Sequence, residues 1–111
     1  SDGARFDLKQ GSGGLVDIEF LLQGLVLIHA ATKAKLRGSG NSARLIARLA
    51  ECDILAAHEA QSLGAAHAYL LDRAIRCTLD GRARMVTRDA DTEAHSAAAH
   101  AIIARNEMAG A

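Results

Sequence analysis

The amino-acid sequence predicts an all-α domain, and three observations support this prediction. The 111 residues include no proline, so no residue in the chain obliges a helix to break. Alanine and leucine, both strong helix formers, are frequent. Aromatic residues make up only 3% of the chain, although 50% of the residues are hydrophobic, so the core must consist of small aliphatic side chains. We expect residues 1–111 to form a single domain, a helical bundle of about four helices.

The first helix is expected to be long and central. It should begin near residue 14 or 15 and run to about residue 37, where Gly38-Ser39-Gly40 ends it. The apolar residues that cover nearly its whole circumference are Leu15, Val16, Ile18, Phe20, Leu21, Leu22, Leu25, Val26, Leu27 and Ile28. A helix that is apolar all round packs against neighbours on several sides.

Two further helices are predicted in the middle of the chain. Asn41 is a suitable N-cap for a helix over residues 42–52. A longer third helix begins after Asp53 and ends at Asp80-Gly81. Its inward positions, chosen by helical spacing, are Ala60, Leu63, His67, Leu70, Leu71, Ala74 and Thr78.

The last third of the chain is less clearly patterned. Residues 82–91 are polar, which predicts a loop. A fourth helix over residues 92–108 should bury alanines and one isoleucine. These inward positions are Ala94, Ala98, Ala101 and Ile102. Because alanine contributes little apolar area, we expect this helix to be the least stable element.

Charge and cysteine content limit the classes of function. Thirteen basic and thirteen acidic residues give a formal net charge of zero, which argues against broad binding to nucleic acid or to an anionic membrane. The most apolar stretch, residues 15–31, contains too many polar residues for an ordinary membrane span. Cys52 and Cys77 form no metal or disulfide pattern, which favours free thiols in a reducing, cytoplasmic setting.

A glycine-rich run precedes the first helix. Gly11, Gly13 and Gly14 suggest a phosphate-binding turn, since backbone N–H groups at a helix start attract anions. However, Val16 stands where the dinucleotide motif needs its third glycine, and no preceding strand is expected. The residues therefore favour a tight turn that sets the direction of the first helix.

Acidic residues follow the glycines directly. Asp17 and Glu19 lie in the first turns of the helix, where negative side chains interact favourably with the helix dipole. Glu19 and Gln23 are four residues apart and form a polar stripe on an otherwise apolar helix. Such a stripe is costly without a polar partner. The partner is either a neighbouring domain or ligand, or a hydrogen-bonding group inside the bundle.

Other candidate sites are weaker. Asp89 and Asp91 resemble a magnesium-binding carboxylate pair, but their place before a helix favours N-terminal capping. The five scattered histidines lack metal-ligand spacing, and no complete active site is expected. Arg44 and Arg48 share one helix face, which indicates a solvated surface or, as the minority interpretation, contact with a partner domain.

Several motifs together resemble one known family. These are Phe6-Asp7-Leu8-Lys9, the run from Gly13-Gly14 through Asp17-Ile18-Glu19-Phe20, Gln23, and Asn41 to Ile46 with Arg44. The pattern is similar to glutamine synthetase adenylyltransferase, in which a Gly-Gly-hydrophobic-x-Asp-Ile-Glu-Phe motif opens the helical domain after a nucleotidyltransferase domain. The resemblance covers residues 5–80 and is closer to the C-terminal, adenylylating half. Because the chain begins without Met and enters the motif at once, we expect a fragment of a larger multidomain enzyme.

The resemblance implies a function for the parent enzyme. Such enzymes transfer AMP from ATP to a tyrosine of glutamine synthetase in one half and remove it in the other. ATP and Mg²⁺ would bind the preceding nucleotidyltransferase domain, so no catalytic or metal-binding residue is expected within this fragment, which alone would be inactive. The implied partners are that domain, glutamine synthetase and the PII signalling protein.

Five residues are candidates for the contact with the catalytic domain. They are Lys9, Asp17, Glu19, Gln23 and Arg44. Lys9 would attract a phosphate or a carboxylate, whereas Asp17 and Glu19 would orient groups of the catalytic domain. The alternative hypothesis is a stand-alone helical protein-interaction module without catalysis, and the reading frame upstream of Ser1 distinguishes the two.

Overall fold

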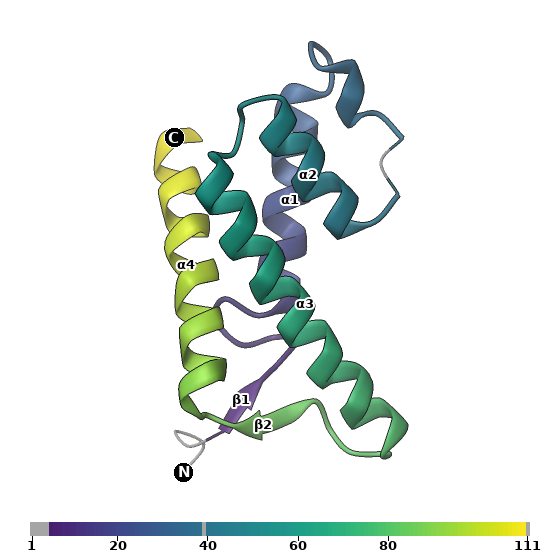
Figure 1. Ribbon diagram of the computed structural model, residues 1–111, viewed down its shortest axis with the longest axis vertical. Coiled ribbons are helices and arrows are strands. Elements are labelled where there is room, and N and C mark those ends of the chain that lie inside the picture. The colour runs from purple at the N-terminus through teal and green to yellow at the C-terminus, as the bar shows by residue number, and fades with distance from the viewer. Residues whose placement is uncertain (1–4, 39, 111) are drawn as a thin grey trace.

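Residues 5–38 and 40–110 are described by a computed structural model, and within them the chain is a small helical bundle (Figure 1). In chain order the elements are β1 (Arg5–Asp7), α1 (Leu15–His29), a short 3-10 helix η2 (Ala34–Leu36), α2 (Ser42–Glu51), α3 (Ala57–Leu79), β2 (Met85–Thr87) and α4 (Ala90–Gly110). The predicted all-α class with four α-helices is confirmed for the described residues, with one small strand pair added.

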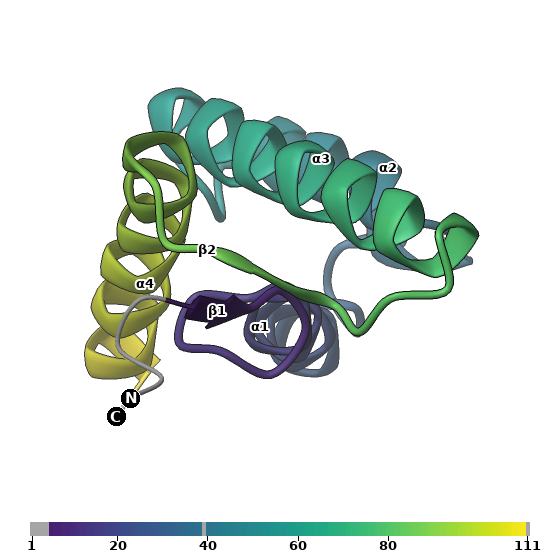
Figure 2. The same cartoon turned by 90° about the horizontal axis from the view of Figure 1, so that it is seen from below.

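The core lies where the four α-helices meet. The long helix α3 packs against α4 and α2, and α1 packs against α2, α3 and α4. Viewed from below, α1 appears end-on beneath α3, with α4 to one side (Figure 2). The largest fully buried side chains are mostly aliphatic: Phe6, Leu8, Ile18, Leu22, Leu36, Leu49, Leu55, Leu63, Leu70, Thr92 and Cys77.

The strand pair corrects the sequence prediction at two places. Residues 85–87 are not loop but strand β2, which pairs antiparallel with β1 so that Phe6 lies opposite Val86. A strand therefore does precede the glycine-rich run. Phe6 is buried on this pair, with the Arg88 guanidinium 5.2 Å from the centre of its ring. Strands of three residues are too short to show a period-two pattern, so the sequence did not reveal them.

The first helix is shorter than predicted. It ends at His29 rather than near residue 37, and α3 is the longest helix. The Arg37 guanidinium explains this end, because it donates hydrogen bonds of 2.8 Å to the carbonyl oxygens of Ala30 and Ala31. A side chain from beyond the helix thus satisfies backbone acceptors at its C-terminus.

The prediction that α1 is a central helix packed on several sides holds only in part, because α1 contacts α2, α3 and α4 but keeps large apolar residues exposed. Its residues Ile18 and Leu22 are fully buried, but Phe20 is 73% exposed, Leu27 84% and Ile28 65%. The three neighbouring helices therefore leave the side with Phe20, Leu27 and Ile28 uncovered. The outer face of α1 remains apolar and open to solvent.

Caps predicted from the sequence are confirmed. The Asn41 side chain accepts a 2.8 Å hydrogen bond from the Arg44 backbone N–H and begins α2. Helix α3 ends at Leu79 with Asp80 as its C-cap, and Gly81 follows with a φ of +69°. Asp89 caps α4, since its carboxylate accepts from the Thr92 N–H at 2.8 Å. These hydrogen bonds satisfy backbone groups that a helix end leaves free.

The predicted inward faces of α3 and α4 hold only in part. In α3, Leu63, His67, Leu70 and Ala74 are buried, Ala60 is half-buried, and Leu71 and Thr78 are exposed. In α4 the buried residues are Thr92, Ser96, Ala99 and Ile102, whereas Ala94 and Ala101 are exposed and Ala98 is half-buried.

The face of α4 is rotated from the predicted one because its polar residues find partners inside. The Thr92 hydroxyl is hydrogen-bonded to the Tyr69 hydroxyl at 3.1 Å. The Ser96 hydroxyl donates to the Glu93 carbonyl at 3.3 Å. Buried hydroxyls with such partners avoid most of the cost of desolvation.

Candidate functional site

The glycine-rich run forms a turn whose backbone groups are used within the chain. The Gly11 N–H donates to the Asp7 carbonyl at 2.9 Å and the Gly14 N–H to the Gly11 carbonyl at 2.8 Å. The Leu15 N–H donates to the carbonyl of Leu8 at 3.0 Å. A phosphate would need these donors to be free. The arrangement confirms the interpretation of the run as a tight turn.

Gly13 also explains why the turn needs glycine. Its φ is +74°, and a Cβ at this position would lie 2.2 Å from the carbonyl oxygen of Ser96. The turn therefore packs directly against the α4 backbone. Only glycine permits both the left-handed conformation and this close approach.

Asp17 belongs to the same turn. Its carboxylate accepts a 2.9 Å hydrogen bond from the Gly13 N–H and is half-buried. An acidic side chain is favourable here because the first turn of a helix carries partial positive charge. The carboxylate thus holds the glycine turn on the start of α1.

Lys9 and Glu19 lie together on a groove between α1 and α3. The groove has a volume of about 350 Å³ and its rim carries Arg84 as a third charged residue. Its apolar lining comes from Leu15, Leu71, Ala74, Ile75 and Leu79. Two cationic side chains and one carboxylate therefore surround an apolar floor, which we call the α1–α3 groove.

Glu19 also faces a buried histidine. A carboxylate oxygen lies 3.9 Å from Nε2 of His67, and the Glu19 side chain is 51% exposed. Burial lowers the pKa of His67 below its ordinary value of 6.5, while the nearby Glu19 carboxylate partly offsets this effect. Glu19, one residue of the polar stripe predicted on α1, thus has His67 as a partner inside the bundle, while about half of the Glu19 side chain is exposed.

The other three candidates, Asp17, Gln23 and Arg44, are not brought to this groove. Gln23 is exposed one turn after Glu19 on α1. Arg44 is exposed on α2, and its backbone N–H serves the Asn41 cap. Neither residue lines the α1–α3 groove. Lys9 and Glu19 are the pair that the structure assembles.

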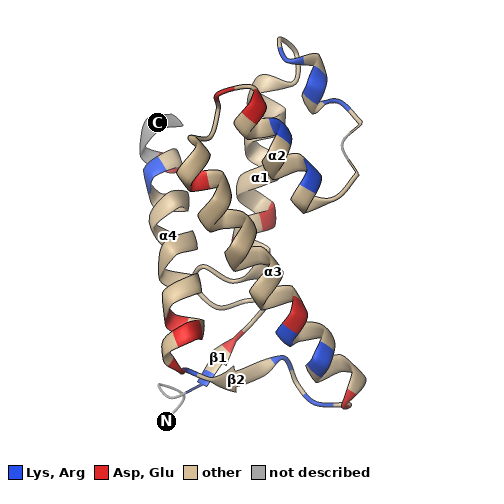
Figure 3. Cartoon of the chain, in the orientation of Figure 1, with Lys and Arg blue, Asp and Glu red and all other residues tan. Residues whose placement is uncertain are grey.

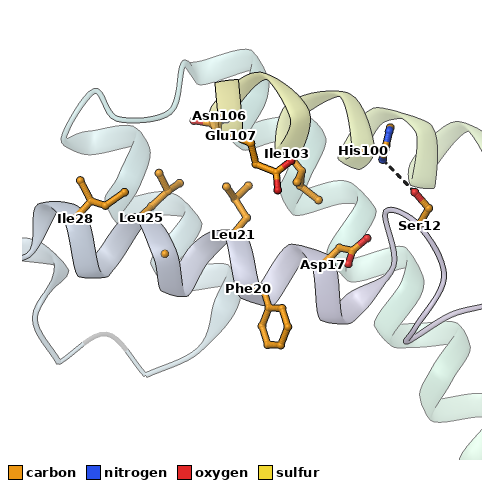
Figure 4. Close-up of a pocket in the computed structure, with 11 residues that line it drawn as sticks. Ser12, Asp17, Phe20, Leu21, Leu25, Ile28, His100, Ile103, Asn106 and Glu107 are labelled. Atoms are coloured by element: carbon orange, nitrogen blue, oxygen red, sulfur yellow. Dashed lines mark hydrogen bonds between the residues drawn. The ribbon is translucent and has the colours of Figure 1, made fainter. Parts of the chain in front are cut away.

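A second groove runs between α1 and α4, and the sequence did not reveal it (Figure 4). Its volume is about 500 Å³. Its lining residues are Ser12, Asp17, Phe20, Leu21, Gly24, Leu25, Ile28, His100, Ile103, Asn106 and Glu107. Leu21 and Leu25 point toward α4, Phe20 points away from it, and Ser12 is hydrogen-bonded to His100 Nδ1 at 3.0 Å. This surface is the α1–α4 groove.

A signal for the second groove was present in the sequence. Gly24 stands in the middle of a helix, where glycine is unfavourable relative to alanine. A Cβ at Gly24 would meet no other atom within 4 Å. The position of α4 across from Gly24 depends on tertiary packing, so spacing along the chain could not show the groove itself.

Candidate metal-binding clusters do not form among the described residues. No group of three or more His, Cys, Asp or Glu side chains gathers there. Asp89 caps α4, and His95 stacks on Tyr69 with ring centres 4.4 Å apart. In the same part of the chain, Cys77 is buried and Cys52 half-buried, both as free thiols.

The surface charge is mixed. Figure 3 shows both signs of charge distributed over the molecule, with a stretch of α4 that carries neither. None of the helices in the described part of the chain combines the length and apolar character that a membrane crossing requires.

These features define a class of protein. The chain is a helical bundle domain with an open apolar helix, two flanking grooves and, in its described part, no assembled cluster of metal-binding side chains. Comparison with known proteins identifies the family. The chain belongs to the GlnD PII-uridylyltransferase family, whose model matches residues 3–105.

Curated relatives agree with the resemblance noted in the sequence. The chain is 49% identical over 105 residues to the bifunctional glutamine synthetase adenylyltransferase/adenylyl-removing enzyme of Stenotrophomonas maltophilia strain R551-3, covering 94% of this chain and 11% of that enzyme. It is 46% identical over 86 residues to the enzyme of the same name from Xanthomonas axonopodis pv. citri, covering 78% of this chain and 9% of that enzyme. The chain thus spans about a tenth of the length of these relatives.

Proposed function

We propose that this chain is the helical interdomain and regulatory segment of a glutamine synthetase adenylyltransferase/adenylyl-removing enzyme. The parent enzyme would transfer AMP from ATP to a tyrosine of glutamine synthetase and remove it in its other half. The names of relatives that match 94% and 78% of the chain support this assignment. The chain would follow the nucleotidyltransferase domain of the C-terminal, adenylylating half.

The observation that carries the interdomain role is the uncovered side of α1. This helix is apolar around its circumference, yet Phe20, Leu27 and Ile28 are mostly exposed. Large apolar side chains gathered on one element commonly mark an interaction surface. In the parent enzyme a neighbouring domain would cover this side, and α1 would then become the central helix that its sequence pattern predicts.

The α1–α3 groove is the proposed contact with the nucleotidyltransferase domain. Lys9 and Glu19 line it together, so they can pair with groups of opposite charge on that domain. Asp17 would act through the turn it holds, since its carboxylate is bonded to the Gly13 N–H. Gln23 and Arg44 would lie at the edges of the contact, on α1 and α2.

The chemistry would take place outside this chain. ATP and Mg²⁺ would bind the preceding domain, where the metal offsets the negative charge of the phosphates. Glutamine synthetase and the PII signalling protein are the proposed protein partners, and the cytoplasm is the proposed location. The described residues of this chain would position the catalytic domain rather than contact the nucleotide.

The test is the substitution Glu19→Gln in the full-length enzyme. We expect lower adenylyl transfer to glutamine synthetase, because a charge at the domain contact is removed while the shape of the side chain is kept. Glu51→Gln is a matched control, since the Glu51 side chain is also 51% exposed and also lies within 4 Å of a nitrogen of one basic residue, Nζ of Lys35 at 3.6 Å. Equal transfer rates for the two variants and the unmodified enzyme would refute the proposed contact.

A further inference from the structure

The α1–α4 groove carries a second inference, which rests on the proposed function and assigns an occupant to the part of the uncovered side of α1 where Phe20 and Ile28 line this groove. We propose that this groove receives an amphipathic helix with basic side chains from another part of the same polypeptide. The observations that support it are the shape of the groove, the glycine at its floor and the charge of its rim.

The shape fits a helix better than a small ligand. On α1 the lining residues run from Asp17 to Ile28, which at 1.5 Å per residue is about 16 Å, or three turns. Phe20 and Ile28 remain 73% and 65% exposed, so the groove does not enclose its occupant as a small-molecule site does. An apolar floor of this length suits a helix that inserts side chains at spacings of three and four residues.

Gly24 makes room at the floor. A glycine in a helix interior is destabilising relative to alanine, and here no atom of the chain lies within 4 Å of where its Cβ would be. Internal packing therefore gives no reason for the missing side chain. A notch at this place allows the backbone of a second helix to approach closely.

The charge of the rim selects the chemistry of the occupant. The lining includes two carboxylates, Asp17 and Glu107, and no Lys or Arg. Glu107 lies near the C-terminus of α4, where the helix dipole is negative, and the last turn of that helix contains no basic residue. Lys or Arg side chains on the occupant would neutralise this end of the groove.

A second copy of the chain fits this groove less well. If two copies met groove to groove, each acidic rim would face another acidic rim, which is unfavourable. If the groove met the exposed Leu71 and Leu79 face of α3, the contact would be head-to-tail and would tend to continue into a filament. The relatives are about nine times longer than the part that this chain matches, so the rest of the polypeptide can supply a helix.

The test places a photo-crosslinking residue in the full-length enzyme. Ile28→p-benzoylphenylalanine places the reactive group at the edge of the groove, where Ile28 is 65% exposed, and the crosslinked peptide is identified by mass spectrometry. We expect a crosslink within one polypeptide to a segment that carries Lys or Arg at helical spacing, with a yield independent of protein concentration. The same residue introduced at Ala47, exposed on α2, measures the background.

Two variants examine the notch and the rim. Gly24→Leu should fill the floor and lower the crosslink yield at least tenfold, and Glu107→Lys should lower it severalfold by reversing charge. Ala47→Leu, outside the groove, should leave the yield unchanged. A yield that rises with concentration, a crosslink to a separate protein, or a yield no greater than the Ala47 background would overturn the proposal. Because Glu19 does not line this groove, the transfer assay of Glu19→Gln judges the domain contact separately.

Discussion

Two glycines beside the same helix differ in what they contribute. At Gly13, in the turn that enters α1, an added Cβ would lie 2.2 Å from the Ser96 carbonyl oxygen. At Gly24, in the middle of α1, an added Cβ would meet nothing within 4 Å. The first glycine is required by packing within the chain, whereas the second is not. The comparison separates the part of α1 that builds this domain from the part available to other partners.

The largest expected change in the free energy of unfolding is at Gly13, in the turn that enters α1. Gly13→Ala should lower the free energy of unfolding by about 3 kcal/mol, because alanine must adopt a left-handed conformation and also displace the α4 backbone. The measurement is urea unfolding of the chain followed by circular dichroism.

Gly38→Ala separates the two causes of that loss. Gly38 has the same φ of +74°, but its Cβ would meet no atom within 4 Å. This control should cost only about 1 kcal/mol, the conformational part alone. Equal losses for the two variants would show that contact with Ser96 does not matter.

Substitution of the second glycine, Gly24, should increase the free energy of unfolding rather than lower it. Gly24→Ala should raise the free energy of unfolding of the chain by about 0.5–1 kcal/mol, because alanine is the better helix former and no neighbour obstructs it. Gly64→Ala in α3 is the matched control, since its Cβ would also meet nothing within 4 Å. A clear loss of stability for Gly24→Ala alone would break the comparison, because it would show that internal packing needs this glycine.

Local signals predicted the parts of the fold that depend on local chemistry. Asn41 and Asp89 begin helices because their side chains accept backbone N–H groups three residues ahead, and residue type with spacing shows this directly. Gly81 marks the end of α3 in the same way. The short strands β1 and β2 pair across 80 residues of chain, so their pairing depends on contacts that spacing does not encode.

Tertiary contacts decided the features that the sequence did not show. Helix α1 ends at His29 because Arg37 binds the carbonyls of the turn that follows. In α4 alanines occur on every side, so periodicity gave no clear inward face, and the Tyr69 hydroxyl helped to set it by bonding to Thr92.

The candidate site also has one part that the sequence predicted and another part that depends on tertiary packing. Lys9 and Glu19 come from the motifs that carry the family resemblance, and the structure places both on one groove. The α1–α4 groove needs the true rotation of α4, which brings His100 and Ile103 opposite α1. The glycine at position 24 was a signal in the sequence that the predictions did not use.

The smallest expected change in the free energy of unfolding at neutral pH is at the contact between Glu19 and His67. This contact lies at the boundary between the covered and open sides of α1. Burial lowers the pKa of His67 in the folded chain below 6.5. The pKa of His67 is lower in the folded chain than in the unfolded chain, so between these two values the unfolded chain binds more protons. The contribution of His67 to the free energy of unfolding is therefore fully present above about pH 6.5 and is lost as the pH decreases below it.

Glu19→Gln should steepen this loss, because the carboxylate is the group that raises the pKa of His67 against the effect of burial. His67→Gln should remove the contribution altogether. The free energy of unfolding, measured in urea at pH 7.5 and pH 5.5, gives the difference for each variant. This range stays above the region in which Glu59 titrates, since Arg105 lowers the pKa of that carboxyl below 4.5. The same pH dependence in all three proteins would show that His67 does not sense Glu19, and that this boundary of α1 is set by apolar packing alone.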